Sequence, residues 1–121
     1  MSKRLIPLIR AFGLIDGLRF FLKRIIKKAG RYRSNRYQSD IYIRDKFADK
    51  YTFKQVFLED QYNFNFPFTP TTMLDGGANI GLASVYFAHR FPNAKIVAVE
   101  PSEENYRMIL KNTEKFPNVM A

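Results

Sequence analysis

The apolar and polar positions at the start of the chain follow a helical period. From Leu14 onward the spacing predicts an amphipathic helix over residues 14–29, while Pro7 and Gly13 separate residues 4–12 as a weaker helical segment. The apolar face comprises Leu14, Ile15, Leu18, Phe21, Leu22, Ile25, Ile26 and Ala29, and the opposite face comprises Arg19, Lys23, Arg24, Lys27 and Lys28. Charges interrupt each apolar run well before about 18 residues, so no transmembrane span is predicted.

The middle of the chain has no helical period and is rich in aromatic residues. Residues 30–39 are polar and basic and are interpreted as a linker. Residues 41–43 and 51–57 have the β-branched and aromatic composition of strands, with a hairpin turn predicted at residues 49–50. The segment 56–62, "VFLEDQY", could instead form a short helix, and the sequence leaves both interpretations open.

From residue 71 the pattern alternates between short apolar runs and helical spacing, as in a β-α-β-α unit. We expect strands at residues 71–74 and 95–99, helices at 81–90 and from 102 to about 115, and the start of a third strand after 116. This order predicts an α/β fold, the N-terminal half of a Rossmann-like parallel sheet with flanking helices. Half a sheet leaves an edge and a face uncovered, so we expect a truncated chain or, as the alternative, a small domain that needs a partner.

Charge changes the interpretation of the N-terminal third. The 121 residues carry a net charge of +9, but residues 1–36 hold eleven Lys or Arg and one acid, Asp16, whereas the remainder is nearly neutral. We therefore divide the chain into residues 1–36, a basic helix and linker, residues 37–70, an aromatic β segment, and residues 71–121, a partial nucleotide-binding domain.

Two interpretations of the basic helix remain open. A basic amphipathic helix is typical of a segment that lies on an anionic membrane surface, here through residues 14–29. It is equally typical of a helix that covers its own domain and keeps its charges in water. We expect a cytoplasmic protein, peripheral at the inner face of the membrane if the helix binds lipid. No nucleic acid is expected as a partner, because no nucleic-acid-binding motif accompanies the basic segment.

A glycine-rich loop joins the first predicted parallel strand to its helix in the stretch "MLDGGANIGLAS", residues 73–84. Gly76, Ala78 and Gly81 have the 1-3-6 spacing of the dinucleotide fingerprint. The middle position of that fingerprint is normally glycine, because the pyrophosphate approaches the backbone there. The spacing keeps a nicotinamide-dependent oxidoreductase open as an alternative. The chain has no cysteine and a single histidine, so we expect no metal site.

Two acids select among the ligands of such a loop. Asp75 would repel a pyrophosphate, whereas it suits a ligand that carries an ammonium and a sulfonium group, as S-adenosylmethionine does. Glu100 ends the second predicted strand, 19 residues after Gly81, where an acid accepts hydrogen bonds from the ribose hydroxyls of a nucleoside. The alternatives are a plain loop acid at Asp75 and a helix-flanking charge at Glu100. Asn79 either adopts an unusual backbone conformation or donates to the ligand.

These residues resemble the FkbM family of S-adenosylmethionine-dependent methyltransferases. The likeness lies in the acid-x-Gly-Ala-Asn-x-Gly loop and in the later stretch "KIVAVEPSEENYRMILKN", and it covers about residues 40–121. The loop residues that match are Asp75, Gly77, Ala78, Asn79 and Gly81, and those after the second strand are Glu100, Pro101, Asn105 and Tyr106. Gly76 departs from the pattern, since an aliphatic residue is common there.

The resemblance implies a class I methyltransferase fold and methyl transfer to the oxygen of a sugar, glycan, lipid or secondary metabolite. The acceptor partner is accordingly a small molecule or a glycan. The residues implied to bind the cofactor are Asp75, Gly76, Gly77, Ala78, Asn79, Gly81, Glu100 and Pro101, with Tyr62 shaping the pocket. Catalytic groups come from later strands and loops in this fold, so no catalytic residue is assigned and the chain alone is expected to be inactive.

Overall fold

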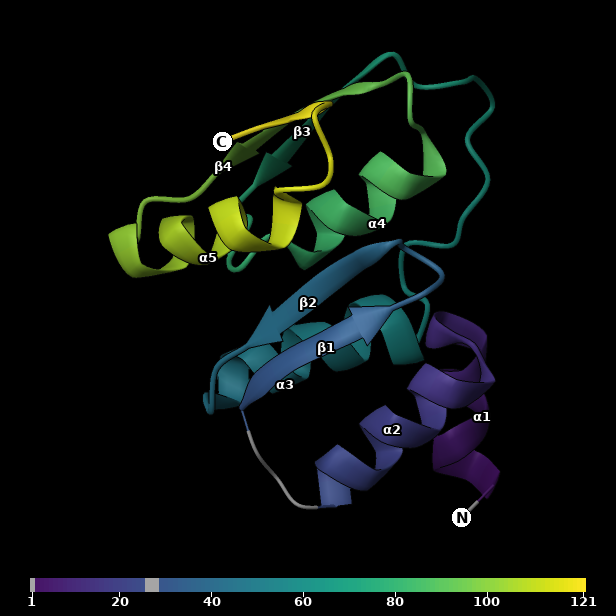
Figure 1. Ribbon diagram of the computed structural model, residues 1–121. Coiled ribbons are helices and arrows are strands. Elements are labelled where there is room, and N and C mark those ends of the chain that lie inside the picture. The colour runs from purple at the N-terminus through teal and green to yellow at the C-terminus, as the bar shows by residue number, and fades with distance from the viewer. Residues whose placement is uncertain (1, 26–28) are drawn as a thin grey trace. The chain divides into compact units, whose positions relative to one another are not determined.

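The computed structural model describes residues 2–25 and 29–121, and the chain forms two compact units, Met1–Gln61 and Tyr62–Ala121 (Figure 1). The first unit contains α1 (Ser2–Phe12), α2 (Leu14–Ile25), β1 (Gly30–Ser34), β2 (Ser39–Ile43), α3 (Phe47–Phe53) and the π-helical turn η1 (Lys54–Leu58). The second contains β3 (Thr72–Gly76), α4 (Leu82–Arg90), β4 (Lys95–Val99), α5 (Glu103–Thr113) and β5 (Val119–Met120). The division at residues 36 and 70 stays a prediction.

Helices α1 and α2 pack closely through a glycine. A Cβ atom at Gly17 would lie 2.8 Å from the Cα atom of Ile9, nearer than side chains approach a backbone, so only glycine fits here. The two helices meet at Gly13, whose N–H donates to the carbonyl oxygen of Ile9 at 2.8 Å. The amphipathic helix predicted from Leu14 is present through Ile25, and the predicted positions 26–28 lie outside the described residues.

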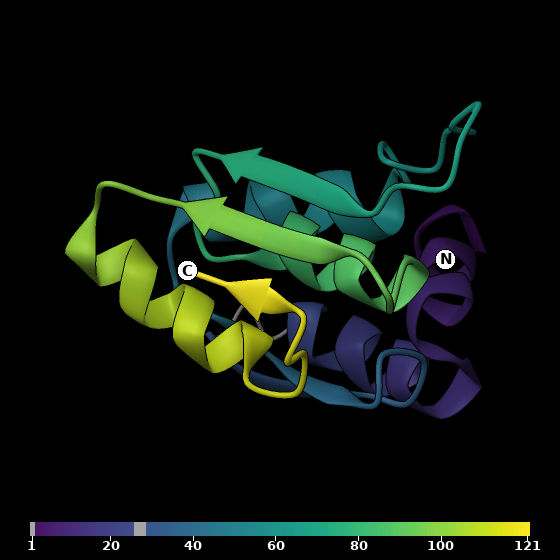
Figure 2. The same ribbon diagram turned by 90° about the horizontal axis from the view of Figure 1, so that it is seen from above.

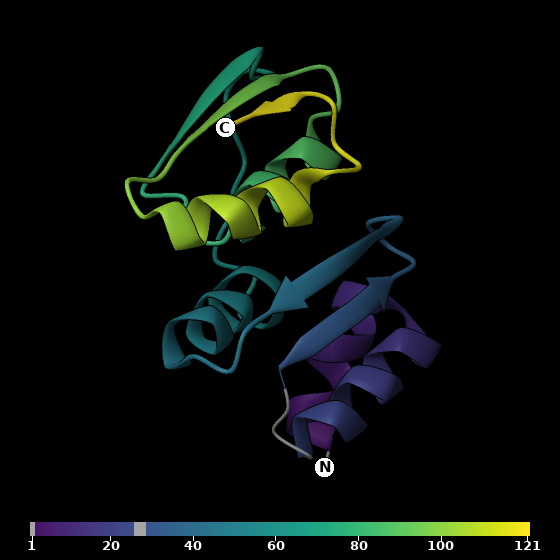
Figure 3. The same ribbon diagram turned by 60° about the vertical axis from the view of Figure 1, so that its left-hand side comes forward.

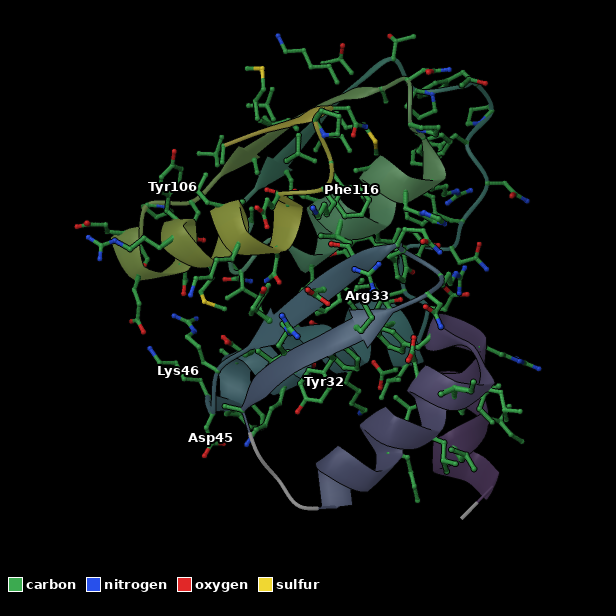
Figure 4. The ribbon with its side chains drawn as sticks, in the orientation of Figure 1. Tyr32, Arg33, Asp45, Lys46, Tyr106 and Phe116 are labelled. Carbon is green, nitrogen blue, oxygen red and sulfur yellow. The ribbon has the colours of Figure 1, made fainter. Side chains whose placement is uncertain are left out.

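The linker predicted at residues 30–39 is wrong, because this segment forms most of a β-hairpin. Strand β1 pairs antiparallel with β2, with Tyr32 opposite Ile41, and β1 runs beside α2 (Figure 3). Tyr32 is buried whereas the next residue, Arg33, is exposed, and the two side chains leave opposite faces of the strand (Figure 4). Burial therefore alternates along β1, and Arg31 and Arg33, two of the basic residues that gave the linker composition, are exposed on its outer face.

The strand predicted at residues 51–57 and the turn at 49–50 are also wrong, because α3 and η1 occupy these positions. Phe53, Val56 and Phe57 are buried at spacings of three and four, which suits a helix and not a strand. Asp49 is buried inside α3, where its carboxylate accepts two hydrogen bonds from the guanidinium of Arg44, at 2.9 and 2.8 Å. The helical alternative for residues 56–62 holds as far as Leu58.

A cluster of four aromatic rings forms the centre of the first unit. Phe12 stacks on Phe53 with ring centroids 5.4 Å apart, and Phe57 meets Phe12 edge-on at 5.4 Å. Tyr37, in the hairpin turn, completes the cluster at 5.1 Å from Phe57. Aromatic pairs in such geometry add to the energy of burial, so these rings hold α1, the hairpin and α3–η1 together.

The second unit is the predicted parallel α/β sheet. Its strands lie in the order β3-β4-β5 and all run parallel, with Leu74 opposite Val97 and Val97 opposite Met120. Helices α4 and α5 both cover the same face of this sheet (Figures 1 and 2). The α/β fold class is thus confirmed, and Leu74, Val99 and Met120 remain exposed.

Among the described residues, no helix combines the length and the apolar character that crossing a membrane requires.

Truncation of the buried ring in Phe12→Ala should lower the free energy of unfolding by about 3–5 kcal/mol, because it removes burial and leaves a cavity in the aromatic cluster. The matched control is Phe47→Ala, since the Phe47 ring is 82% exposed. Urea denaturation followed by circular dichroism measures both. Equal losses in the two variants would contradict the assignment of this cluster as the core of the first unit.

Candidate cofactor site at the glycine loop

The glycine loop covers the carboxyl ends of two neighbouring strands. Gly76, the last residue of β3, lies opposite Val99, the last residue of β4. The loop then turns back over β4, because the N–H of Ala78 donates to the carbonyl oxygen of Val99 at 3.0 Å. Gly77, Asn79 and Gly81 have φ angles of +67°, +50° and +82°. Asn79 thus takes the unusual backbone conformation that was one of its two expected roles.

Gly81 is the position where the loop touches α5. A Cβ atom there would lie 3.2 Å from the Cα atom of Ile109, and the positive φ adds strain for any other residue. One turn of α5 further on, the buried amide of Asn112 donates through Nδ2 to the carbonyl oxygen of Ile80 at 2.8 Å. Helix α5 thus holds the loop in place through a close contact and a buried hydrogen bond.

Glu100 links the loop to the start of α5. Its Oε2 accepts a hydrogen bond from the backbone N–H of Asn79 at 2.9 Å. Its Oε1 accepts from the N–H of Ser102 at 2.9 Å and, at 3.4 Å, from Nδ2 of Asn105. The carboxylate is half-buried and retains acceptor capacity, because two carboxylate oxygens offer about four lone-pair sites. It can therefore fix the loop and accept hydroxyl donors together.

The carboxylate of Asp75 is held by a hydrogen bond from the first turn of α4. The hydroxyl of Ser84, which is fully buried, donates to Oδ2 of Asp75 at 2.6 Å. Burial raises the pKa of Asp75 above its ordinary value, and hydrogen bonds from the side chain and backbone of Ser84 oppose that shift. The carboxylate is therefore fixed in orientation at the end of β3.

The backbone of the loop is open at its first two glycines. Cβ atoms at Gly76 and Gly77 would meet no atom within 4 Å, so a ligand has room to approach the backbone there. Pro101 is exposed immediately after Glu100. With a carboxylate at the end of each of two paired strands, these residues fit a cationic nucleoside better than a phosphate. Among the described residues, no cluster of three side chains is placed to hold a metal ion.

Tyr62 lies along α4. Its ring contacts Tyr86 and Phe87, with centroids 6.3 and 5.3 Å apart, and its carbonyl oxygen accepts a hydrogen bond from Arg90 at 3.0 Å. Its role in shaping a cofactor pocket stays a prediction. Arg90 also donates to the carbonyl oxygen of Phe64 at 2.6 Å, so this arginine fixes the segment before β3.

Sequence reasoning did not single out the residues that support the site, Ser84, Arg90 and Asn112. The signal for Asn112 is its spacing, three positions after the apolar Ile109, which places a polar side chain on the same face of α5 as a core residue. Ser84 and Arg90 carry no comparable signal, because their partners are a distant carboxylate and two backbone carbonyl groups.

The variant Gly81→Ala should lower the free energy of unfolding by about 1–2 kcal/mol, because alanine is strained at this φ and would press on Ile109. Gly76→Ala is the matched control, since its φ is not positive and its Cβ would meet no atom within 4 Å. Denaturant titration of both variants measures the difference. A Gly81→Ala protein as stable as the control would refute the close contact with α5.

Asp75 predicts a pH dependence of stability with a defined sign. The pKa of Asp75 is higher in the folded state than in the unfolded state, so the folded state binds the proton more tightly. The stability that this proton gives is fully present below the pKa of the unfolded state and is lost as the pH rises through the pKa of the folded state. The variant Asp75→Asn cannot ionise, so its stability relative to the natural chain should increase from pH ~4 towards neutrality. Melting temperatures of both proteins across this pH range test the prediction. A difference between the two melting temperatures that does not change with pH would contradict the raised pKa of Asp75.

Comparison with known proteins gives two partial similarities. The chain is 36% identical over 72 residues to methyltransferase sdnD of Sordaria araneosa, a match that covers 59% of this chain and 27% of that protein. It is 35% identical over 69 residues to AMB antimetabolite synthetase AmbE of Pseudomonas aeruginosa, a match that covers 55% of this chain and 3% of that protein.

No family model and no solved structure matches the chain significantly. The chain spans about a quarter of the length of the methyltransferase and a small fraction of the synthetase. It therefore has a distant and partial similarity to a methyltransferase.

Proposed function

We propose that this chain is the cofactor-binding part of an S-adenosylmethionine-dependent methyltransferase of the FkbM type. The observation that carries the proposal is the pair of carboxylates, Asp75 and Glu100, at the ends of paired strands β3 and β4 around an open glycine backbone. The partial similarity to a methyltransferase supports it independently.

Each residue of the loop has a distinct task in this proposal. Glu100 accepts hydrogen bonds from the ribose hydroxyls, and Asp75 provides the negative charge that attracts the ammonium group. Gly76 and Gly77 leave space for close approach to the backbone, while Ala78 and Asn79 form the turn that Glu100 holds closed. Pro101 borders the site, and Gly81 sets the loop on α5.

The cofactor supplies an electrophilic methyl group bonded to its sulfonium sulfur. The described residues bind and orient, and the chemistry then needs an acceptor oxygen in line with the methyl group and a base to take its proton. We propose a hydroxyl of a sugar, glycan, lipid or secondary metabolite as the acceptor, on the strength of the family resemblance.

A nicotinamide dinucleotide is the alternative ligand, suggested by the spacing of Gly76, Ala78 and Gly81. Residues 73–84 contain no Lys or Arg, so no nearby cation in this segment offsets the repulsion between Asp75 and a pyrophosphate. The charge of the loop therefore favours S-adenosylmethionine.

Ligand binding to the ¹⁵N-labelled chain, followed by NMR, tests the proposal. S-adenosylmethionine should shift the amide signals of Gly77 and Asn79, and NAD should shift them far less. Adenosine should bind about tenfold or more tightly than 2′,3′-dideoxyadenosine, because the deoxygenated sugar cannot donate to Glu100. This comparison needs no change to the protein.

A matched pair of variants completes this experiment. Glu100→Ala should weaken S-adenosylmethionine binding by about tenfold or more, whereas Glu103→Ala should not, because Glu103 is exposed and pairs with Arg107. Equal affinity for NAD, or undiminished binding by Glu100→Ala, would rule out the proposed site.

A further inference from the structure

The first residues of the predicted apolar face of α2 are exposed. Leu14, Ile15 and Leu18 are 68%, 62% and 45% exposed, and their spacing places them on one side of the helix. A helix that covered its own domain would bury these positions first. The first unit therefore leaves the apolar face uncovered at these three residues.

Among the described side chains of α2, the two buried positions are a polar residue and a glycine. Gly17 packs against the backbone of Ile9 in α1, and Asp16 is buried, with its Oδ2 accepting a hydrogen bond from the N–H of Asn35 in the hairpin turn at 2.9 Å. This arrangement is the reverse of an ordinary surface helix, which buries its apolar side chains and exposes its charges. Over residues 14–18, packing within the first unit thus uses Asp16 and Gly17 and leaves the apolar residues exposed.

The charge of the same segment indicates what the exposed face binds. Residues 1–36 hold eleven Lys or Arg, and the one acid among them, Asp16, is buried. A second copy of the chain would carry the same excess of positive charge and would be repelled. An anionic bilayer offers both an acyl region for apolar side chains and a negative field for Lys and Arg.

We propose that the first unit binds the surface of an anionic lipid bilayer, with the exposed face of α2, defined by Leu14, Ile15 and Leu18, inserted at the boundary between headgroups and acyl chains. This surface lies in the first unit, whereas the loop residues proposed to bind the cofactor lie in the second, so either proposal can fail without the other.

The chain has no tryptophan, so one introduced tryptophan reports its own surroundings. The variant Leu18→Trp should show a blue shift of its emission with phosphatidylglycerol-containing vesicles and none with pure phosphatidylcholine. Leu110→Trp is the control, because Leu110 is 49% exposed on α5 in the second unit, and its emission should not shift. A shift of equal size in both variants would overturn the proposal.

Vesicle co-sedimentation of the natural chain provides a measurement that depends on no variant. Binding to anionic vesicles should fall steeply as salt is raised, because the attraction between Lys or Arg and the lipid is screened. Binding that is insensitive to salt, or equal for neutral vesicles, would contradict it.

The double variant Leu14→Ser/Leu18→Ser should bind about tenfold or more weakly to anionic vesicles, and Leu74→Ser/Leu110→Ser should bind as the natural chain does. All four leucines are exposed, and circular dichroism verifies that both variants are folded. Sedimentation velocity tests whether the face instead binds a second copy of the chain. If the natural chain forms a dimer that Leu14→Ser/Leu18→Ser abolishes, and does not bind vesicles, the face serves self-association and the proposal is wrong.

Discussion

The close contact between Gly81 and Ile109 is the constraint on which the second unit depends. It brings the backbone of the loop onto α5, and the buried amide of Asn112 then reaches the carbonyl group of Ile80. With α5 at this distance, its N-terminal turn lies beside the end of β4, where Glu100 bonds to both the loop and Ser102. The strand ends, the loop and the helix therefore form one rigid assembly, a requirement for recognising a ligand by fixed hydrogen bonds.

The sheet unit was predictable because its local signals and its tertiary structure agree. The apolar run 95–99 matches β4 at both ends, and α4 and α5 agree with their predicted ranges to within about two residues. Helical spacing acts locally, and so does the cap of α5, where the side chain of Ser102 accepts a hydrogen bond from the N–H of Asn105. The candidate carboxylates could be found because each follows a predicted strand. Ser84 could not, because a serine near the start of a helix does not reveal its hydrogen bond to Asp75, and the position of Asn112 on its helix could mark it as a buried polar residue but not reveal its partner, the carbonyl oxygen of Ile80.

The first unit was harder to predict because composition and burial disagree there. Residues 30–39 look like a linker, yet every second residue of β1 faces inward, and Tyr37 joins the aromatic cluster. Residues 51–57 have strand composition, yet the cluster needs Phe53 and Phe57 on one side of a helix. In α2 the disagreement is greatest, since Asp16 and Gly17 are buried whereas Leu14 and Leu18 are exposed. In each case tertiary packing, which composition does not reveal, decides the outcome.

The hydrogen bonds of Glu100 have a consequence for how such a site could change its ligand. The same carboxylate stabilises the loop and is the candidate acceptor for a sugar, so a substitution that alters sugar preference also disturbs the turn at Asn79. Evolution or design could not vary specificity here one residue at a time. A successful change would have to supply a replacement acceptor for the amides of Asn79 and Ser102 in the same step. A single substitution of Glu100 would therefore change the ligand preference only at the cost of the loop's structure.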